Sequence, residues 1–409
     1  MRVLALPYSH FLSHLSRPLM VSRELRRRGH EVVFAGESPK MRFVRDEGFH
    51  AIPIHEPCPE EFLRNLEREK VRFVSEDQID RMIHADLAAF QEVKPDLVLS
   101  DCRASAPIST RVAGLKHAAI THVYCTPHRA VPSVPLFGWL PRKLMPRHAR
   151  LWEILDSLNV GLETFAFNVG MGYYSRLAKR HGLTERLKAM DCFVGKDLTL
   201  LADIPEFFPT RGLPDRFRYV GPLTWKTSMP APAWWQSMLR SVHRPLVYLT
   251  LGTSGTPEFL AKTAIAFASS PMTVVMSSGG QDAGIKNQEG KLYAEPFLDA
   301  DLAMEACDIV VSHGGHGTTY QAIEHGKPVI GIPMTPGLRF SMARTQDLGL
   351  GRSLAWKTFS RNPASLVKAV QQVAGTVSYS RRAKEFQTIL KKTNGPSLAA
   401  DALEGGLLR

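Results

Sequence analysis

Short apolar segments alternate with amphipathic segments in the first part of the chain. "RVLALP" (residues 2–7) contains a short apolar run, and in "LSRPLMVSRELRRRGH" (15–30) the large apolar residues recur at helical spacing. A second apolar run, "EVVFAG" (31–36), follows directly. Gly29 stands where the end of a helix favours a residue that accepts positive φ. Strand, helix and strand in this order predict a parallel βαβ unit.

The alternation continues and then begins again. "PDLVLS" (95–100) and "HAAITHVY" (117–124) predict further strands of the same sheet, whereas residues 136–190 read as helical and irregular. After a proline-rich passage near residue 225, five more strand candidates alternate with helical segments: "PLVYLTLG", "MTVVMSS", "KLYAEPF", "DIVVSHG" and "PVIGIP". The pattern predicts an α/β protein with two Rossmann-like, doubly wound parallel sheets that face each other across a cleft.

This pattern sets expected domain boundaries. The first domain covers residues 1–220, a linker covers 221–235 and the second domain covers 236–385. The remaining residues, 386–409, form a C-terminal helix that can pack back on the first domain.

Composition narrows the class of protein. With 409 residues, 44% of them hydrophobic, the chain suits two soluble domains, and the apolar run at its N-terminus is too short for a signal peptide, so we expect a cytoplasmic protein. The five cysteines form no close pair, which disfavours disulfides and zinc. A net charge of +12 suits an anionic partner, but the basic residues are scattered and no nucleic-acid motif accompanies them, which disfavours nucleic acid.

The most informative segment is "VVSHGGHGTTYQAIEHGKPVIGIP" (310–333). An apolar strand ends at Ser312, and a helix is predicted from near Thr318 to Gly326. A glycine loop between a strand and a helix directs free N–H groups at an anion, although a tight turn without a ligand is the alternative. The spacing matches neither the nicotinamide fingerprint nor the P-loop.

Several segments together resemble a known family. "SHGGHGTTYQAIEHGKPVIGIP" is similar to the donor-binding signature of the UDP-glycosyltransferase superfamily, especially its bacterial macrolide and natural-product members. The likeness includes "RRRGHEVVFAG", "PDLVLSD", "DLTLLADIPEFFP", "RYVGPL" and "RPLVYLTLGTSG", in the order and at the spacing of the family. The resemblance implies the GT-B fold of two Rossmann-like domains and a nucleoside diphosphate sugar as donor.

The resemblance also implies donor-site residues. His313 and Thr318 hold the diphosphate together with the loop amides, and the family's ribose-binding Glu is replaced by Gln321. Members of the family that use glucose bind the sugar hydroxyls with an Asp or Glu followed by a Gln. "PMTPGLRFSMAR" lacks both residues at this position, which favours a deoxysugar or a sugar held differently. The donor-site positions are Gly252, Thr253, Ser254, Phe297 (base stacking), His313, Gly314, Gly315, Gly317, Thr318 and Gln321, with Gly337 and Leu338 at the sugar position.

Inverting sugar transfer requires a base for the acceptor hydroxyl, and histidine suits this task near neutral pH. "PYSHFLSHLSRP" supplies His10 and His14, of which His14 stands at the distance from Gly29 that the family uses, although the proline of the family's G-H-x-x-P comes one place late. Asp101 matches the carboxylate that orients the base. Its structural alternative is an N-cap for the following helix.

Other signals are weaker. "DAD" (299–301) has the D-x-D form of a metal site but fits a helix cap better, and the His10/His14 and His313/His316 pairs lack further ligands, so we expect no metal. "FGWLPRKLMPRHARLWEIL" (137–155) combines aromatic and basic residues that can touch a membrane surface or line the acceptor site, with a partly buried helix as the alternative.

Together these features predict an inverting glycosyltransferase. It moves a sugar, with a deoxysugar as the favoured type, from a UDP- or dTDP-sugar to a hydroxyl of a small, largely apolar natural-product or lipid acceptor, with His14 as base. The alternatives are a nucleotide-sugar epimerase of the same fold and a non-catalytic auxiliary protein. The sugar, the nucleotide base, the acceptor and the oligomeric state stay open.

Overall fold

The chain forms two compact units. One contains Met1–Leu223 and Asn394–Arg409, and the other contains Thr224–Thr393. The computed structural model describes residues 1–134, 136, 149–227, 229–251, 257–268, 270–281 and 284–407. Among these residues no helix is long and apolar enough to cross a bilayer.

The first unit contains a seven-stranded parallel sheet in the order β3-β2-β1-β4-β5-β6-β7. The order reverses between β1 and β4, which is the switch point at which doubly wound sheets bind ligands. Pro7 at the end of β1 is paired with Asp101 at the end of β4. The strands are β1 (Arg2–Pro7), β2 (Glu31–Ala35), β3 (His50–Ile52), β4 (Leu97–Asp101), β5 (Lys116–Thr121), β6 (Leu198–Leu201) and β7 (Phe217–Tyr219).

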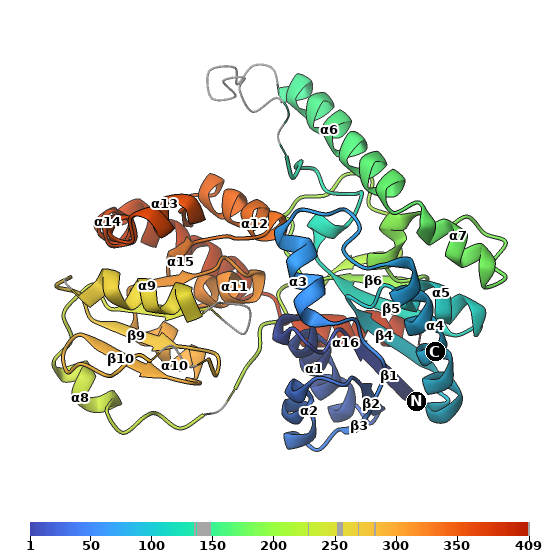
Figure 1. Cartoon of the computed structure of the whole chain (residues 1–409), viewed down its shortest axis with the longest axis horizontal. Coiled ribbons are helices and arrows are strands. Elements are labelled where there is room, and N and C mark those ends of the chain that lie inside the picture. The colour runs from blue at the N-terminus through green and yellow to red at the C-terminus, as the bar shows by residue number, and fades with distance from the viewer. Residues whose placement is uncertain are drawn as a thin grey trace. The chain divides into compact units, whose positions relative to one another are not determined.

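Helices surround this sheet (Figure 1). The predicted helix at 15–30 is confirmed as α1, whose leucines are buried against the sheet, and Gly29 takes the expected positive φ of 88°. The helices of the unit are α1 (Leu12–Arg27), α2 (Arg42–Asp46), α3 (Pro59–Glu67), α4 (Glu76–Val93), α5 (Ala106–Val112), α6 (Ala149–Gly170), α7 (Tyr173–Arg180) and α16 (Gly395–Gly406), with 3-10 turns η1 (Pro39–Met41), η2 (Val123–Cys125) and η5 (Ala189–Phe193).

The second unit contains a six-stranded parallel sheet in the order β10-β9-β8-β11-β12-β13. The five predicted strands of this half are all present, and the sequence analysis missed β13, which has three residues and little apolar character. The strands are β8 (Val247–Thr250), β9 (Val274–Ser277), β10 (Leu292–Glu295), β11 (Ile309–Ser312), β12 (Val329–Gly331) and β13 (Gly351–Ser353). Two doubly wound parallel sheets confirm the predicted fold class.

In the described part of the chain, helices connect the strands of the second unit except between β9 and β10, and three helices follow β13 in succession. The helices of this unit are α8 (Trp235–Arg240), α9 (Pro257–Ala268), α10 (Ala300–Ala306), α11 (His316–Glu324), α12 (Pro336–Asp347), α13 (Trp356–Arg361), α14 (Ala364–Ala374) and α15 (Val377–Leu390). After α15 the chain returns to the first unit, where α16 packs on α1. Arg28 holds α16 by ion pairs to Asp401 (2.6 Å) and Glu404 (2.7 Å).

Candidate active site

The predicted base and its carboxylate meet at the carboxyl end of the first sheet. The loop after β1 turns into α1, and the first turn of this helix carries His14. The Nδ1 atom of His14 lies 2.8 Å from Oδ1 of Asp101, the last residue of β4. Asp101 is buried, whereas the His14 side chain remains 24% exposed. A partly exposed imidazole oriented by a buried carboxylate is the arrangement that a general base requires.

The structure disfavours the two alternatives that the sequence left open, His10 as the base and Asp101 as a helix N-cap. His10 contacts different carboxylates, because its Nε2 atom lies 3.9 Å from Glu37 and 4.0 Å from Glu56. The interpretation of Asp101 as an N-cap is wrong, since α5 begins after Ser105 and has no side-chain cap. The carboxylate of Asp101 accepts hydrogen bonds from α1 instead.

Arg17 is the residue at this site that the sequence analysis missed. Its Nε and Nη2 atoms donate to Oδ2 (2.7 Å) and Oδ1 (2.6 Å) of Asp101. Its Nη1 atom lies 2.5 Å from Nε2 of His122, whose Nδ1 atom lies 3.2 Å from Asp203. The available signal was the helical spacing of three residues between His14 and Arg17, which places both side chains on one face of α1.

The electrostatics of the site favour an ionised Asp101. Burial alone would raise the pKa of Asp101, but the Arg17 guanidinium and His14 hold it below its ordinary value. Burial alone would lower the pKa of His14, but the neighbouring Cys102 and Asp101 raise it to about 9. His14 is therefore largely protonated at neutral pH, and its basic form gains population as the pH rises.

The glycine loop lies at the carboxyl end of β11 in the second unit. Gly314 has a φ of 85°, and a Cβ at this position would lie 2.5 Å from Cγ of Met342. Gly315 is the N-cap of α11 and supplies no side chain to the N–H groups of the first turn. The helix begins at His316 and not near Thr318 as predicted, so Gly317 and Thr318 belong to the first turn, where N–H groups have no partner within the helix.

Two buried polar atoms beside this loop suit an anionic ligand. Within the described part of the chain, Nδ1 of His313 and Oγ1 of Thr319 have no hydrogen-bond partner. Burial lowers the pKa of His313 to about 4, so the imidazole is neutral and carries one N–H donor. Gly317 is exposed and has open space where a Cβ would be, so a ligand can approach its backbone.

Gln321 is held by a carboxylate from a neighbouring helix. Its Nε2 atom donates to Oδ1 of Asp301 at 2.9 Å, so Oε1 is the end of the amide that can accept a ribose hydroxyl. In the "DAD" segment Asp299 caps α10, as expected, by accepting a hydrogen bond from the N–H of Leu302. Asp301 has a different role, because it also contacts His325 at 2.9 Å.

The other predicted donor residues are less closely grouped. Gly252, Thr253 and Ser254 lie outside the described residues. The ring of Phe297 lies against Gly280, with its Cζ atom 3.0 Å from the place of a Cβ. Gly337 and Leu338 belong to the first turn of α12, and the carbonyl oxygen of Leu338 is 3.8 Å from the place of a Cβ on Gly314. The structure thus brings the start of α12 next to the glycine loop.

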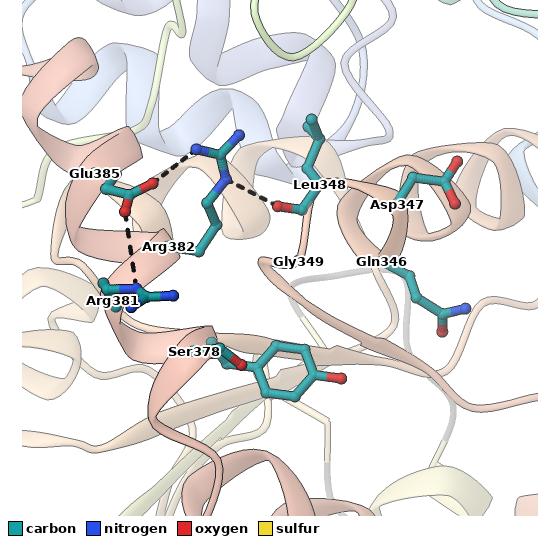
Figure 2. A pocket seen from close by; sticks show the side chains of 9 residues that line it. Gln346, Asp347, Leu348, Gly349, Ser378, Arg381, Arg382 and Glu385 are labelled. Carbon is teal, nitrogen blue, oxygen red and sulfur yellow. Dashed lines mark hydrogen bonds and ion pairs between the residues drawn. The ribbon is translucent and has the colours of Figure 1, made fainter. Parts of the chain in front are cut away.

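A separate surface hollow in the second unit contains none of the predicted residues (Figure 2). It has a volume of about 380 Å³ and lies between the end of α12 and α15. Arg382 donates to the carbonyl oxygen of Leu348 (3.1 Å) and to Glu385 (2.7 Å), so its charge is already paired.

Two doubly wound sheets, one with a histidine and aspartate pair and the other with a glycine loop that opens a helix, define the class of GT-B glycosyltransferases. The chain belongs to the same glycosyltransferase family as a "PGL/p-HBAD biosynthesis glycosyltransferase" of Mycobacterium tuberculosis. The two proteins are 30% identical over 406 residues, which cover 97% of this chain and 90% of the relative. It is thus a nucleotide-sugar-dependent glycosyltransferase.

Further comparisons agree with this family. A "PGL/p-HBAD biosynthesis rhamnosyltransferase" of Mycobacterium bovis is 30% identical over 390 residues, covering 93% of this chain and 82% of the relative. Residues 257–392 match the glycosyltransferase family 28 C-terminal domain.

Solved structures share the fold. The calicheamicin glycosyltransferase CalG4 has a TM-score of 0.68 and 19% identity, with 100% of this chain and 98% of that chain covered. The spinosyn rhamnosyltransferase SpnG, complexed with thymidine diphosphate, has a TM-score of 0.69 and 17% identity, with 99% and 100% covered.

Proposed function

We propose that the protein is an inverting glycosyltransferase that moves a deoxysugar, such as rhamnose, from a dTDP- or UDP-sugar to a hydroxyl of an apolar natural product or lipid. The observation that carries this proposal is the 2.8 Å contact between Nδ1 of His14 and buried Asp101, at the carboxyl end of the first sheet. This contact leaves Nε2 of His14 as the atom that can take a proton from an acceptor.

In the proposed mechanism Asp101 accepts the Nδ1–H of His14 and fixes its tautomer. Nε2 removes the proton of the acceptor hydroxyl, whose oxygen attacks the anomeric carbon from the face opposite the diphosphate. A new C–O bond forms as the bond to the diphosphate breaks, and the nucleoside diphosphate leaves with the electron pair. The first-turn amides of α11 and His313 then stabilise the negative charge that develops on the diphosphate.

The deoxysugar is favoured by the start of α12. Gly337 has no side chain and Leu338 has an apolar one, so neither side chain can bind sugar hydroxyls. A relative named as a rhamnosyltransferase, and structures of a rhamnosyltransferase with thymidine diphosphate and with spinosyn aglycone, support this donor class and an apolar acceptor.

A panel of dTDP- and UDP-sugars, each incubated with a library of apolar hydroxylated acceptors, tests the proposal. We expect a deoxysugar donor to give a product whose anomeric configuration, read from NMR coupling constants, is opposite to that of the donor. Retained configuration would rule out the single-displacement mechanism. Conversion of the donor without an acceptor would favour the epimerase.

A further inference from the structure

Helix α6 of the first unit exposes a line of large apolar side chains. Figure 1 shows α6 as a long helix that reaches outward from the rest of its unit. Six side chains along it are between 47% and 67% exposed, namely Leu151, Ile154, Leu158, Leu162, Phe165 and Val169. Large apolar surfaces of this kind are uncommon on soluble domains unless they bind something.

A loop held by α6 carries two further exposed apolar residues. Val134 and Leu136 are 61% and 51% exposed. Asn159 on α6 holds this loop, because its Oδ1 accepts from the N–H of Leu136 and its Nδ2 donates to the carbonyl of Val134, both at 2.9 Å. These two residues and the six of α6 form the apolar stripe. It contains eight of the fourteen exposed large hydrophobic residues in the described part of the chain, so it is a concentrated surface and not ordinary scatter.

The stripe is straight and uncharged. Its α6 residues recur at intervals that average 3.6 residues, the repeat of a straight α-helix, so they form a line parallel to the axis. Arg150 and Glu153 are exposed near the start of α6, but no exposed residue of this helix from Ile154 onward is charged, and Glu163 is turned toward the unit by Arg129 at 2.6 Å. A straight, uncharged line suits a flat apolar phase better than a partner that pairs by charge.

We propose that the apolar stripe is a membrane-binding site that lies in the boundary between the headgroups and acyl chains of an anionic bilayer. The net charge of +12 draws the protein to anionic headgroups, and the stripe then buries its side chains among the acyl chains. Such a site brings the enzyme to the bilayer, where a lipid acceptor is dissolved. This consequence rests on the proposed function, whereas the membrane-binding site itself does not.

Flotation with vesicles of phosphatidylcholine and phosphatidylglycerol tests the site. Salt screens the charge attraction, so binding that remains at high salt reports the stripe. We expect the wild type to float with vesicles at high salt, and Leu162→Glu combined with Phe165→Glu to lose at least about 10-fold in binding, since charges at this depth are costly. Val377→Glu is the matched control, because Val377 is 77% exposed and lies on α15 of the second unit, and it should bind like the wild type.

Three outcomes would overturn the proposal. One is equal vesicle binding by the double variant and the wild type, and another is no binding by the wild type. The third is a dimer in light scattering that the double variant dissociates, with no vesicle binding, which would assign the stripe to a second copy. Circular dichroism and a Leu162→Ser, Phe165→Ser variant guard against misfolding. Transfer to a water-soluble acceptor should be unchanged in all variants, so failure of this site is distinct from failure of the proposed base.

A second, independent observation concerns Arg17. Its side chain is 9% exposed and lies in the middle of a chain of side-chain contacts, each of 3.2 Å or less. The chain runs through Asp203, His122, Arg17, Asp101 and His14. We infer that Arg17 is a positioning residue for the base. Two hydrogen bonds fix the plane of the Asp101 carboxylate, so that Oδ1 receives the Nδ1–H of His14.

The charge of Arg17 also opposes protonation of His14. Its Nη2 atom lies 2.9 Å from Nδ1 of His14, and a nearby cation disfavours a second cation. The charged and titratable groups around His14 are Arg17 on its own helix, Asp101 and Cys102 at the end of β4, and His122 after β5. Loss of Arg17 should therefore raise the pKa of His14 and loosen its orientation together.

Kinetics of Arg17→Gln and Arg17→Lys test this role, with Arg23→Gln as matched control. Arg23 lies on the same helix and makes a similar paired contact with Glu47, away from Asp101. We expect Arg17→Gln to lower kcat by about 10- to 100-fold, the usual effect of losing a group that orients a functional side chain. The rise of kcat/KM with pH should move to higher pH, and Arg17→Lys should restore part of this shift. An unchanged pH profile, with a loss no larger than in Arg23→Gln, would reduce Arg17 to a structural ion pair.

Discussion

At the scale of single residues, the proposed base is held in an unusual protonation state. Cys102 and Asp101 together outweigh burial and raise the pKa of His14 to about 9, well above its ordinary value. Only the neutral imidazole can accept the proton of an acceptor. If His14 is the base, as proposed, the local charges set the pH at which the enzyme works, while the 2.8 Å contact with Asp101 orients the ring.

A pH–rate profile tests this description of His14. Because the neutral fraction grows with pH, we expect kcat/KM to rise from neutral pH, to pass its midpoint near pH 9 and to level off only above that pH. A profile that is flat between neutral pH and this value would show that His14 does not titrate in the rate-limiting step.

Cys102 offers a second test at the same scale. Among the neighbours that raise the pKa of His14, Cys102 has the largest influence, so Cys102→Ser should lower that pKa and shift the profile toward neutral pH. Cys58→Ser is the control, since Cys58 is exposed and belongs to the same unit. Identical profiles for the two variants would contradict the assigned influence.

Removal of the imidazole gives the strongest expected effect. We expect His14→Ala to lower kcat by about 10²- to 10⁴-fold, the usual contribution of a general base, with donor affinity retained. His10→Ala should stay near wild type, because His10 contacts Glu37 and Glu56. Stopped turnover in the His10 variant together with normal turnover in the His14 variant would reverse the assignment.

At the scale of elements, the glycine loop leads directly into α11, and two glycines of this segment have different physical roles. Gly314 has positive φ and no room beside Met342, so Gly314→Ala should lower the free energy of unfolding by about 1–3 kcal/mol through overpacking. Gly317 has open space around it, so Gly317→Ala should leave the melting temperature unchanged and weaken binding of a nucleoside diphosphate. Calorimetric melting and titration with dTDP or UDP measure both.

The two glycine variants check each other. Equal losses of stability would contradict the packing difference between the two sites. Undiminished nucleotide affinity in Gly317→Ala, with a normal melting temperature, would remove the first turn of α11 from the proposed diphosphate site.

At the scale of the whole molecule, the last helix belongs to the first unit although a complete second unit precedes it in the chain. Leu403 of α16 is fully buried in the core of the first unit. We expect Leu403→Ala to destabilise that unit by about 2–5 kcal/mol. Leu398→Ala is the control, because Leu398 on the same helix is 41% exposed and should change stability little.

Amide hydrogen exchange can show which part of the protein Leu403→Ala destabilises. Protection should fall in β1 and α1, which share a core with Leu403, and stay unchanged in the second unit. Equal loss of protection in both units would show that they unfold as one cooperative body.

The sequence alone determined the fold class and most of the proposed chemistry. Apolar runs of strand length, separated by helical periods, require parallel sheets because the intervening helices are crossover connections. The order of His14, Asp101 and the glycine loop after predicted strands was sufficient to place them near the carboxyl ends of the sheets, and the resemblance to a known family implied their roles. These features are local or depend on chain order, so the sequence contains them directly.

Only the tertiary structure decided which side chains meet. In the sequence Asp101 fits both a helix cap and a carboxylate that orients the base, and the register of β1 with β4 places it in contact with His14 of α1. In the sequence Arg17 is one of many basic residues, and only the packing of α1 against β4 places its guanidinium in contact with Asp101. The exposure of the α6 stripe has the same origin, since a helical pattern shows that a face is apolar, whereas only the packing of the other elements shows whether anything covers it.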